Sequence, residues 1–227
     1  VLIFDKPIAT QSQIVLGCQV KVEDQIRDYA KALVVGDVLS EMAWRKLREE
    51  AGVTYGAGAY TNVYDGGASL LSMSSLVQND SVGFGVQTMF DLVQKGAAGE
   101  VDKQALANAK WSRARKYVLG QQSSAQMLSR LAGTGLDDIS FFETYPTDLG
   151  NVAVDDFAPM LSTCEGQEVV TIVGPKIYAE EQLKKEGIAY EVIEWEAMYE
   201  AQLDKKELKK YLKKKAKAAE SAESTEG

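Results

Sequence analysis

The sequence contains no histidine, only two cysteines and no apolar run long enough to cross a membrane. Without histidine, the chain cannot build a Ser-His-Asp or Cys-His catalytic centre, or any zinc site with a histidine ligand. Two cysteines alone cannot complete a conventional structural zinc site either. A membrane-spanning helix needs about 20 consecutive apolar residues, and no segment approaches that length. These absences remove the commonest hydrolytic centres from this chain.

The two cysteines, Cys18 and Cys164, lie far apart in the sequence. Such a pair says little about the redox compartment, and the chain is larger than the small scaffolds that depend on disulfides. We therefore expect two small buried thiols, with a disulfide between them as the alternative.

The composition is that of an ordinary globular protein: 45% of the 227 residues are apolar and 26% are charged. The formal net charge of −8 argues against general nucleic-acid binding. The chain begins Val1-Leu2-Ile3-Phe4-Asp5, with neither an initiating Met nor a basic segment ahead of an apolar stretch. We therefore expect the start to be an internal cut point in a longer protein, with any targeting signal outside this chain.

Apolar patterning predicts both strands and helices. Segments rich in Ile, Val and Leu predict strands at 1–5, 11–20, 53–62, 67–77, 168–173 and 190–193. Helical spacing predicts long helices from about 24 to 50, over 79–97 and over 102–120, and shorter ones at 124–131 and after 174. Asp65-Gly66-Gly67 predicts a hairpin turn. This order indicates an α+β fold, an antiparallel or mixed sheet covered on one side by helices.

We expect residues 1–195 to form a single α/β domain, followed by a C-terminal helix and tail over 196–227. Between Asp204 and Lys217 eight lysines and two acidic residues give +6, which leaves −14 on the rest of the chain. These lysines surround the whole helix, which indicates a solvated terminal helix, with contact to nucleic acid or an anionic membrane as a minor alternative. The last residues, 216–227, have no apolar anchor and are expected to be disordered.

The segment from Trp44 to Tyr60 predicts the end of a long helix followed directly by a strand. Arg48 falls in the last helical turn, where a cation is favoured, and Gly52 supplies a left-handed cap. Beyond Gly52, alternation places Val53, Tyr55, Ala57 and Ala59 on one face of the strand. Arg48 and Tyr55 would then flank one helix-to-strand corner.

Simpler interpretations exist for these residues. Arg48 can be a helix-end charge, Tyr55 a half-buried strand aromatic, and Arg45, one turn earlier, competes for any role of Arg48. The acidic pairs at 49–50 and 155–156 lie at helix ends, so dipole and solvent roles are favoured over metal binding. The 67–77 strand carries serines on its polar side, which suits the wall of a wet chamber or an ordinary solvated sheet face.

The corner resembles the C-terminal-half domain of insulinase/pitrilysin-type zinc peptidases. The resemblance rests on Leu47-Arg48-Glu49-Glu50, then Gly52, then Tyr55 seven residues after the arginine. Pro7-Ile8-Ala9-Thr10-Gln11-Ser12-Gln13-Ile14 is similar to the family's entry into its first long strand, and Glu168-Val169-Val170-Thr171-Ile172-Val173-Gly174-Pro175 is similar to its late strand. Together these motifs cover roughly residues 1 to 195 in the family's order.

The resemblance implies a zinc-free half of a metallopeptidase, with zinc held by the H-x-x-E-H motif of a partner half, fused or separate. It implies that Arg48 and Tyr55 contact peptide substrate near that zinc. This chain alone would then be no active enzyme and hold no cofactor. A non-catalytic structural or interaction subunit on the same fold is the alternative. An extracytoplasmic, periplasmic bacterial location is a further expectation from the resemblance.

Overall fold

A computed structural model describes residues 1–64, 69–125, 128–129, 132, 140–193, 200, 207, 209–210 and 212–213. The chain divides into two compact units, Val1–Glu191 and Val192–Gly227, and each is considered by itself. The expected hairpin turn at 65–67 lies outside the described residues. So do the 216–227 tail and much of the helices expected at 124–131 and 196–215.

The sheet is mixed and six-stranded. Its strands are β1 (Leu2–Asp5), β2 (Gln11–Val20), β3 (Thr54–Asn62), β4 (Ser69–Gln78), β5 (Val169–Gly174) and β6 (Glu191–Ile193). Their order is β3-β4-β2-β5-β1-β6. The β3–β4, β4–β2 and β2–β5 pairs are antiparallel, whereas β5 and β1 are parallel. Strand β5 thus lies between β2 and β1, although it follows both by more than 140 residues in the sequence.

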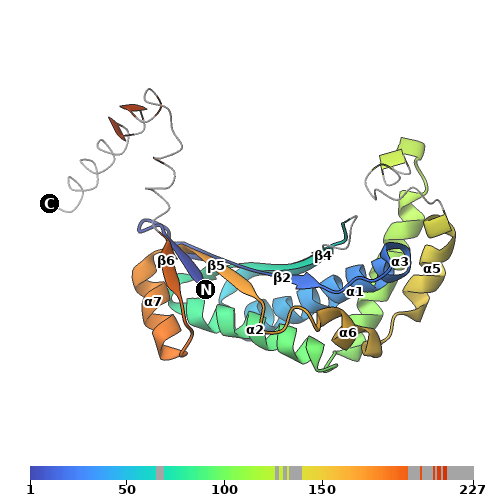
Figure 1. The fold of residues 1–227 in the computed structure, drawn as a ribbon, viewed down its shortest axis with the longest axis horizontal. Helices are drawn as coiled ribbons and strands as arrows, with labels where there is room; N and C mark the ends of the chain where they lie inside the picture. Colours follow the sequence, from blue (N-terminus) through green and yellow to red (C-terminus); the bar gives the residue numbers. More distant parts are fainter. Residues whose placement is uncertain are drawn as a thin grey trace. The chain divides into compact units, whose positions relative to one another are not determined.

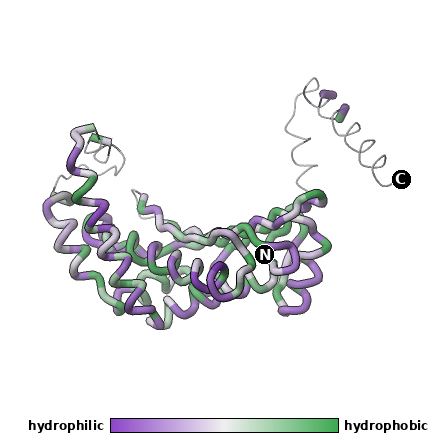
Figure 2. The backbone as a smooth tube through the Cα atoms, turned by 180° about the vertical axis from the view of Figure 1, so that it is seen from behind, coloured by the Kyte–Doolittle hydropathy of each residue, from purple (hydrophilic) through white to green (hydrophobic). Residues whose placement is uncertain are grey.

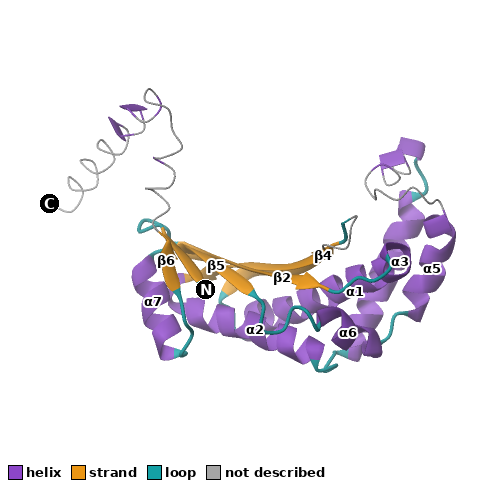
Figure 3. Ribbon diagram, viewed as in Figure 1, coloured by secondary structure: helices purple, strands orange, loops and turns teal. Residues whose placement is uncertain are grey.

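Helices cover one side of this sheet (Figures 1 and 3). They are α1 (Gln25–Trp44) with a π-helical turn at Arg45–Glu50, α2 (Val82–Ala97), α3 (Lys103–Gly120), α5 (Ser140–Asn151), α6 (Phe157–Leu161) and α7 (Lys176–Lys185). Helix α1 packs on β3, α2 on β2 and β4, and α7 on β1. The predicted α+β fold, a mixed sheet covered on one side by helices, is confirmed.

Alternation along the strands separates a helix-covered face from a face that no described helix covers. Ile14, Leu16, Met73 and Ile172 are fully buried on the covered face because successive side chains of a strand point to opposite faces. We call the other face the open face. Its residues, taken from the strand register and burial, are Leu2, Phe4, Gln11, Gln13, Val15, Gly17, Gln19, Tyr60, Asn62, Leu70, Ser72, Ser74, Leu76, Gln78, Val169, Thr171 and Val173.

Apolar and polar stretches alternate along the tube in Figure 2, as expected for elements with one buried side. Among the described residues, no helix combines the length and the apolar character that a membrane span requires.

Helix α1 approaches β3 unusually closely because a glycine lies at the contact. Asp24 caps the helix, accepting hydrogen bonds from the backbone N–H groups of Ile26 and Arg27 at 2.9 and 3.0 Å. Three turns later, Gly36 lies against the backbone of β3. A Cβ added at Gly36 would lie 2.8 Å from the amide nitrogen of Thr61. The packing of the helix on the edge strand therefore requires glycine here.

Gly36→Ala is expected to lower the free energy of unfolding by about 1–2 kcal/mol, measured by urea denaturation. Alanine gains roughly 1 kcal/mol over glycine inside a helix, but pushing rigid backbone apart costs more, typically up to about 3 kcal/mol. Gly17→Ala is the control, because an added Cβ there meets nothing closer than 4.0 Å. An unchanged stability for Gly36→Ala would show that α1 shifts away from β3 without cost.

The expectation of two separate thiols is wrong, because Cys18 and Cys164 form a disulfide. The segment after α6 runs beside the end of β2, where Lys21 N–H donates to the Met160 carbonyl at 2.9 Å and the Thr163 hydroxyl donates to the Gln19 carbonyl at 3.0 Å. These contacts bring the two cysteine Cα atoms to 5.0 Å, within the range of disulfides. A separation of 146 residues hides this proximity from the sequence.

Candidate functional site

At the helix-to-strand corner, the helix ends in a π-helical turn rather than a regular α-helical one. The backbone N–H of Ala51 donates to the Lys46 carbonyl, five residues back, at 3.2 Å. Buried Leu47 anchors this turn, and Gly52 has φ +67°, the left-handed cap expected from the sequence. A π turn widens the helix by one residue and is frequent at functional sites. Here it sets the direction in which Arg48 leaves the helix.

The first residues of β3 contain a β-bulge. Thr54 pairs with Val77 and Ala57 pairs with Ser75, so β3 uses one residue more than β4 in this interval. The predicted alternation is therefore wrong: Ala59 is buried whereas Tyr55 is 82% exposed, although both were assigned to one face. An extra residue reverses the faces of everything beyond it, because the side-chain period of a strand is two.

Two buried hydroxyls hold the bulge in place. The Gly56 N–H donates to Thr54 Oγ1 at 3.0 Å, and that hydroxyl donates in turn to the Leu76 carbonyl at 2.6 Å. The Ser75 hydroxyl donates to the Gly56 carbonyl at 3.0 Å. Thr54 and Ser75 are almost completely buried. The bulge therefore has fixed hydrogen bonds, and Tyr55 is presented by a rigid segment.

Arg48 and Tyr55 meet at this corner, as the sequence predicted. The guanidinium carbon of Arg48 lies 5.4 Å from the centroid of the Tyr55 ring, within cation–π distance. Both side chains are exposed. The pair is an arginine fork with five donors beside a phenol with one donor. Such a surface suits the carbonyl oxygens of a bound peptide.

Trp44 is a third member of the corner that the sequence analysis did not select. Its indole N–H donates to a Glu49 carboxylate oxygen at 3.3 Å. Its ring lies beside the bulge, 3.9 Å from where a Cβ on Gly56 would be. The sequence contained a signal for the role of Trp44, because it precedes Arg48 by four residues and residues four apart share a helix face.

Thr54→Val is expected to lower the free energy of unfolding by about 1–3 kcal/mol. Urea denaturation measures this as a lower midpoint with an unchanged m-value. The substitution keeps the volume but removes the buried Thr54 hydroxyl, which accepts from the Gly56 N–H and donates to the Leu76 carbonyl. Thr10→Val, at an exposed turn residue, is the control and should stay within about 0.5 kcal/mol. A wild-type midpoint for Thr54→Val would mean that the bulge forms without its hydroxyl.

Arg45, the competing arginine, is used in a structural contact. It forms an ion pair with Asp102 at 2.6 Å, and Asp102 also caps α3 through the N–H groups of Gln104 and Ala105. The Ala105 N–H, and then the Arg45 guanidinium, hold the pKa of the Asp102 carboxyl below its usual range. Arg48 is therefore the better candidate for a contact with substrate.

The acidic pairs also serve structure. Glu50 pairs with Lys46 at 2.6 Å, and Asp156 accepts from the Ala153 N–H at 2.8 Å and pairs with Lys31 at 3.4 Å. Among the described residues, no group of three or more His, Cys, Asp or Glu side chains is placed to hold a metal ion.

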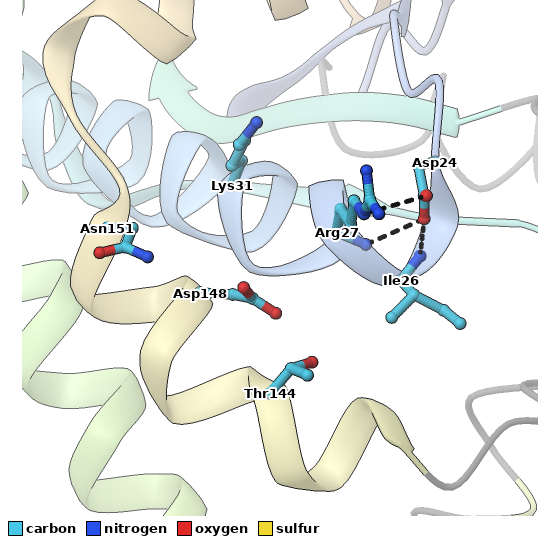
Figure 4. A pocket seen from close by; sticks show the side chains of 7 residues that line it. All are labelled: Asp24, Ile26, Arg27, Lys31, Thr144, Asp148 and Asn151. Atoms are coloured by element: carbon cyan, nitrogen blue, oxygen red, sulfur yellow. Dashed lines mark hydrogen bonds and ion pairs between the residues drawn. The ribbon is translucent and has the colours of Figure 1, made fainter.

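A separate pocket lies between the start of α1 and α5 (Figure 4). Asp148 and Thr144 of α5 lie across from Arg27 of α1 and from Asp24, the residue that caps α1, in this view. The Asp24 carboxylate is used as the helix cap, and Lys31 pairs with Asp28 at 3.0 Å. Two of the charged groups that line this pocket are thus engaged in local structure.

Several solved structures share this fold, and some of them are described as M16 peptidases. A peptidase M16 inactive domain from Pseudomonas fluorescens matches 77% of this chain at 16% identity and TM-score 0.62. A putative M16-like peptidase from Alicyclobacillus acidocaldarius matches 77% at 14% identity and TM-score 0.61. A chain of complex III from Candida albicans matches 80% at 12% identity and TM-score 0.61. At these identities the likeness concerns the fold.

Residues 1–113 match the family model of the peptidase M16 inactive domain. This chain belongs to the insulinase/pitrilysin-type family, as a half-domain of the inactive, zinc-free type. It spans 44%, 43% and 48% of the three solved chains, so it corresponds to less than half of each. No curated protein matches this chain.

Proposed function

We propose that this chain is the zinc-free half of a zinc metallopeptidase. In this proposal a partner half, fused or separate, carries H-x-x-E-H, and the two halves close around a peptide or an unfolded polypeptide. The support is the family, together with a length that is less than half of each solved relative. Residues 1–195 would form the half-domain, and 196–227 an appended helix and tail.

The observation that carries a substrate role is the corner itself: two exposed donor side chains, 5.4 Å apart, on a rigid π turn and bulge. Arg48 and Tyr55 would donate hydrogen bonds to substrate carbonyl oxygens beside the partner's active site. Zinc bound by the partner half would activate water, with the motif glutamate as general base. A donor that reaches the scissile carbonyl also stabilises the developing oxyanion, typically by about 3 kcal/mol.

The test is reconstitution of the two halves. We expect this chain alone to hold no stoichiometric zinc and to cleave no peptide. Mixed or fused with the half that carries H-x-x-E-H, it should raise the peptidase activity of that half many-fold. A zinc half with full activity in the absence of this chain would contradict the proposal, and so would tightly held zinc in this chain.

A structural or interaction subunit is the second candidate function. It is supported by the match to a chain of complex III, a protein whose description names an assembly and not a peptidase. The two candidates differ in the partner half: a partner without H-x-x-E-H, or a complex that assembles stably but cleaves nothing, favours the structural role.

We also propose an extracytoplasmic location. The Cys18–Cys164 disulfide supports it, because disulfides persist in oxidising compartments and are rare in the cytosol.

A further inference from the structure

The open face of strands β1 to β5 has an unusual composition. None of its residues, as defined above, carries a charge, in a chain where 26% of residues are charged. The face consists of aliphatic and aromatic side chains with Ser, Thr, Gln, Asn and Gly. A merely solvated sheet face in so charged a chain would be expected to carry Lys and Glu.

This face contains a hollow whose origin is visible in the strand register. Tyr60, Ser72, Gly17 and Val169 form one row across β3, β4, β2 and β5. The two central members are small, whereas Tyr60 and Val169 at the ends are 51% and 56% exposed. The result is a hollow of about 520 Å³, within the range of small-ligand sites.

The lining of the hollow is uncharged and mixed in polarity. Tyr64 and Leu70 add exposed apolar surface, and Asn62 adds an amide. Apolar walls fit a large uncharged side chain, and neighbouring amides and hydroxyls can bond to the peptide groups on either side of it. Nucleic acid does not fit, because the described lining contains no cation.

The hollow and the corner lie within reach of one extended peptide. Leu76 stands opposite the bulged pair Tyr55–Gly56 in the β3–β4 register. Ser72 lies four residues from Leu76 along β4, about 13 Å at the rise of a strand. A segment of about four extended residues therefore spans the distance.

We infer that the hollow around Gly17 and Ser72 is a side-chain subsite for uncharged polypeptide segments that carry an aromatic or large aliphatic residue. It deepens the proposed function, on which it rests for the source of the peptide, by naming the class of substrate. Selection acts through the side chain in the hollow, whereas the corner grips backbone carbonyl oxygens without regard to sequence.

The test measures binding of short capped peptides made of Ser, Thr and Gln with one central Phe. The peptides carry an uncharged fluorophore, and anisotropy reports their binding to the full chain. Replacing the Phe by Glu or by Lys should weaken binding about 10- to 100-fold, the value of burying one large apolar side chain. Equal affinity for the three peptides overturns the inference.

Gly17→Val fills the hollow from within the strand and should weaken binding of the Phe peptide about 10-fold or more. It is expected to fold, since a Cβ at Gly17 meets nothing closer than 4.0 Å and Val suits a strand. Gln11→Val, on the same strand and face but outside the hollow, is the matched control and should leave affinity within about 2-fold. Val169→Ser removes one apolar wall and provides a second, independent variant.

Two outcomes separate this inference from the proposed function. The subsite is overturned if Gly17→Val and Val169→Ser bind the Phe peptide with unchanged affinity, or if the peptide does not bind even at millimolar concentration. The proposed role of the corner would then still be tested by the reconstitution assay. Loss of affinity in these variants with no effect of Arg48→Ala on binding or cleavage supports the subsite and removes the corner's role.

Discussion

Arg48→Ala should lower kcat/KM of the proposed two-half peptidase about 100-fold, with fold and zinc content unchanged. The expected size is that of losing a donor to a developing negative charge, whereas loss of simple backbone gripping costs nearer 10-fold. Arg48 is exposed and its described contact is with Tyr55, so its removal should change stability by no more than about 0.5 kcal/mol. Steady-state cleavage of a fluorogenic peptide measures the effect.

Tyr55→Phe keeps the ring beside the guanidinium and removes the phenol hydroxyl, so about a 10-fold loss is expected. The double variant should lose less than the product of the single effects, because the side chains touch each other and would act on one bound peptide. Arg48→Lys separates charge from geometry, because lysine retains a cation but lacks the planar fork. Its kcat/KM should lie between those of the wild type and Arg48→Ala.

Arg45→Ala is the control one turn away. Its ion pair with Asp102 is partly exposed to solvent, so its loss should cost about 1 kcal/mol of stability and leave kcat/KM close to wild type. Wild-type cleavage by both Arg48→Ala and Tyr55→Phe would make the corner purely structural, and the substrate role proposed for it would be withdrawn.

The features of the corner that depend on local chemistry could be predicted from the sequence. A helix that stops before a strand needs a residue that tolerates positive φ, and Gly52 was the obvious candidate. The meeting of Arg48 and Tyr55 followed from the short connection between them. The strand at 11–20 could also be predicted, because a segment rich in Ile, Val and Leu is typical of a strand.

The bulge and the π turn could not be predicted in the same way. Each adds one residue to a regular ladder, and one extra residue changes the direction of a side chain without changing composition or period over the whole element. Thr54 and Ser75 carry the hydroxyls that fix the bulge, yet as single residues they look like ordinary strand Thr and Ser. The hollow at Gly17 likewise depends on which small residues share a row across four strands.

The disulfide is the largest departure from the sequence-based expectation, and its removal should have the largest effect on stability. The bond joins β2 to the segment after α6 across 146 residues, so it closes most of the chain into a loop. For so long a loop the chain-entropy model gives about 5 kcal/mol, and measured losses typically fall between about 2 and 5 kcal/mol. The cysteines are also buried, so replacement loses packing as well.

The double variant Cys18→Ala with Cys164→Ala is therefore expected to melt about 10 °C below the wild type, by differential scanning calorimetry. Wild-type protein scanned with a thiol reductant should lose most of the same stability, which separates the bond itself from the packing that the alanines remove. Thr163→Ala is the matched control: it removes only the hydrogen bond to the Gln19 carbonyl and should cost about 1 kcal/mol.

The same experiment bears on the compartment. A stability that depends strongly on the disulfide is useful only where the bond persists, so the large expected loss and the extracytoplasmic proposal stand together. Two free thiols in the native protein, titrated without reductant, would show that the pair stays reduced. The location would then have no structural support, whereas the fold and the Arg48–Tyr55 corner would be unaffected.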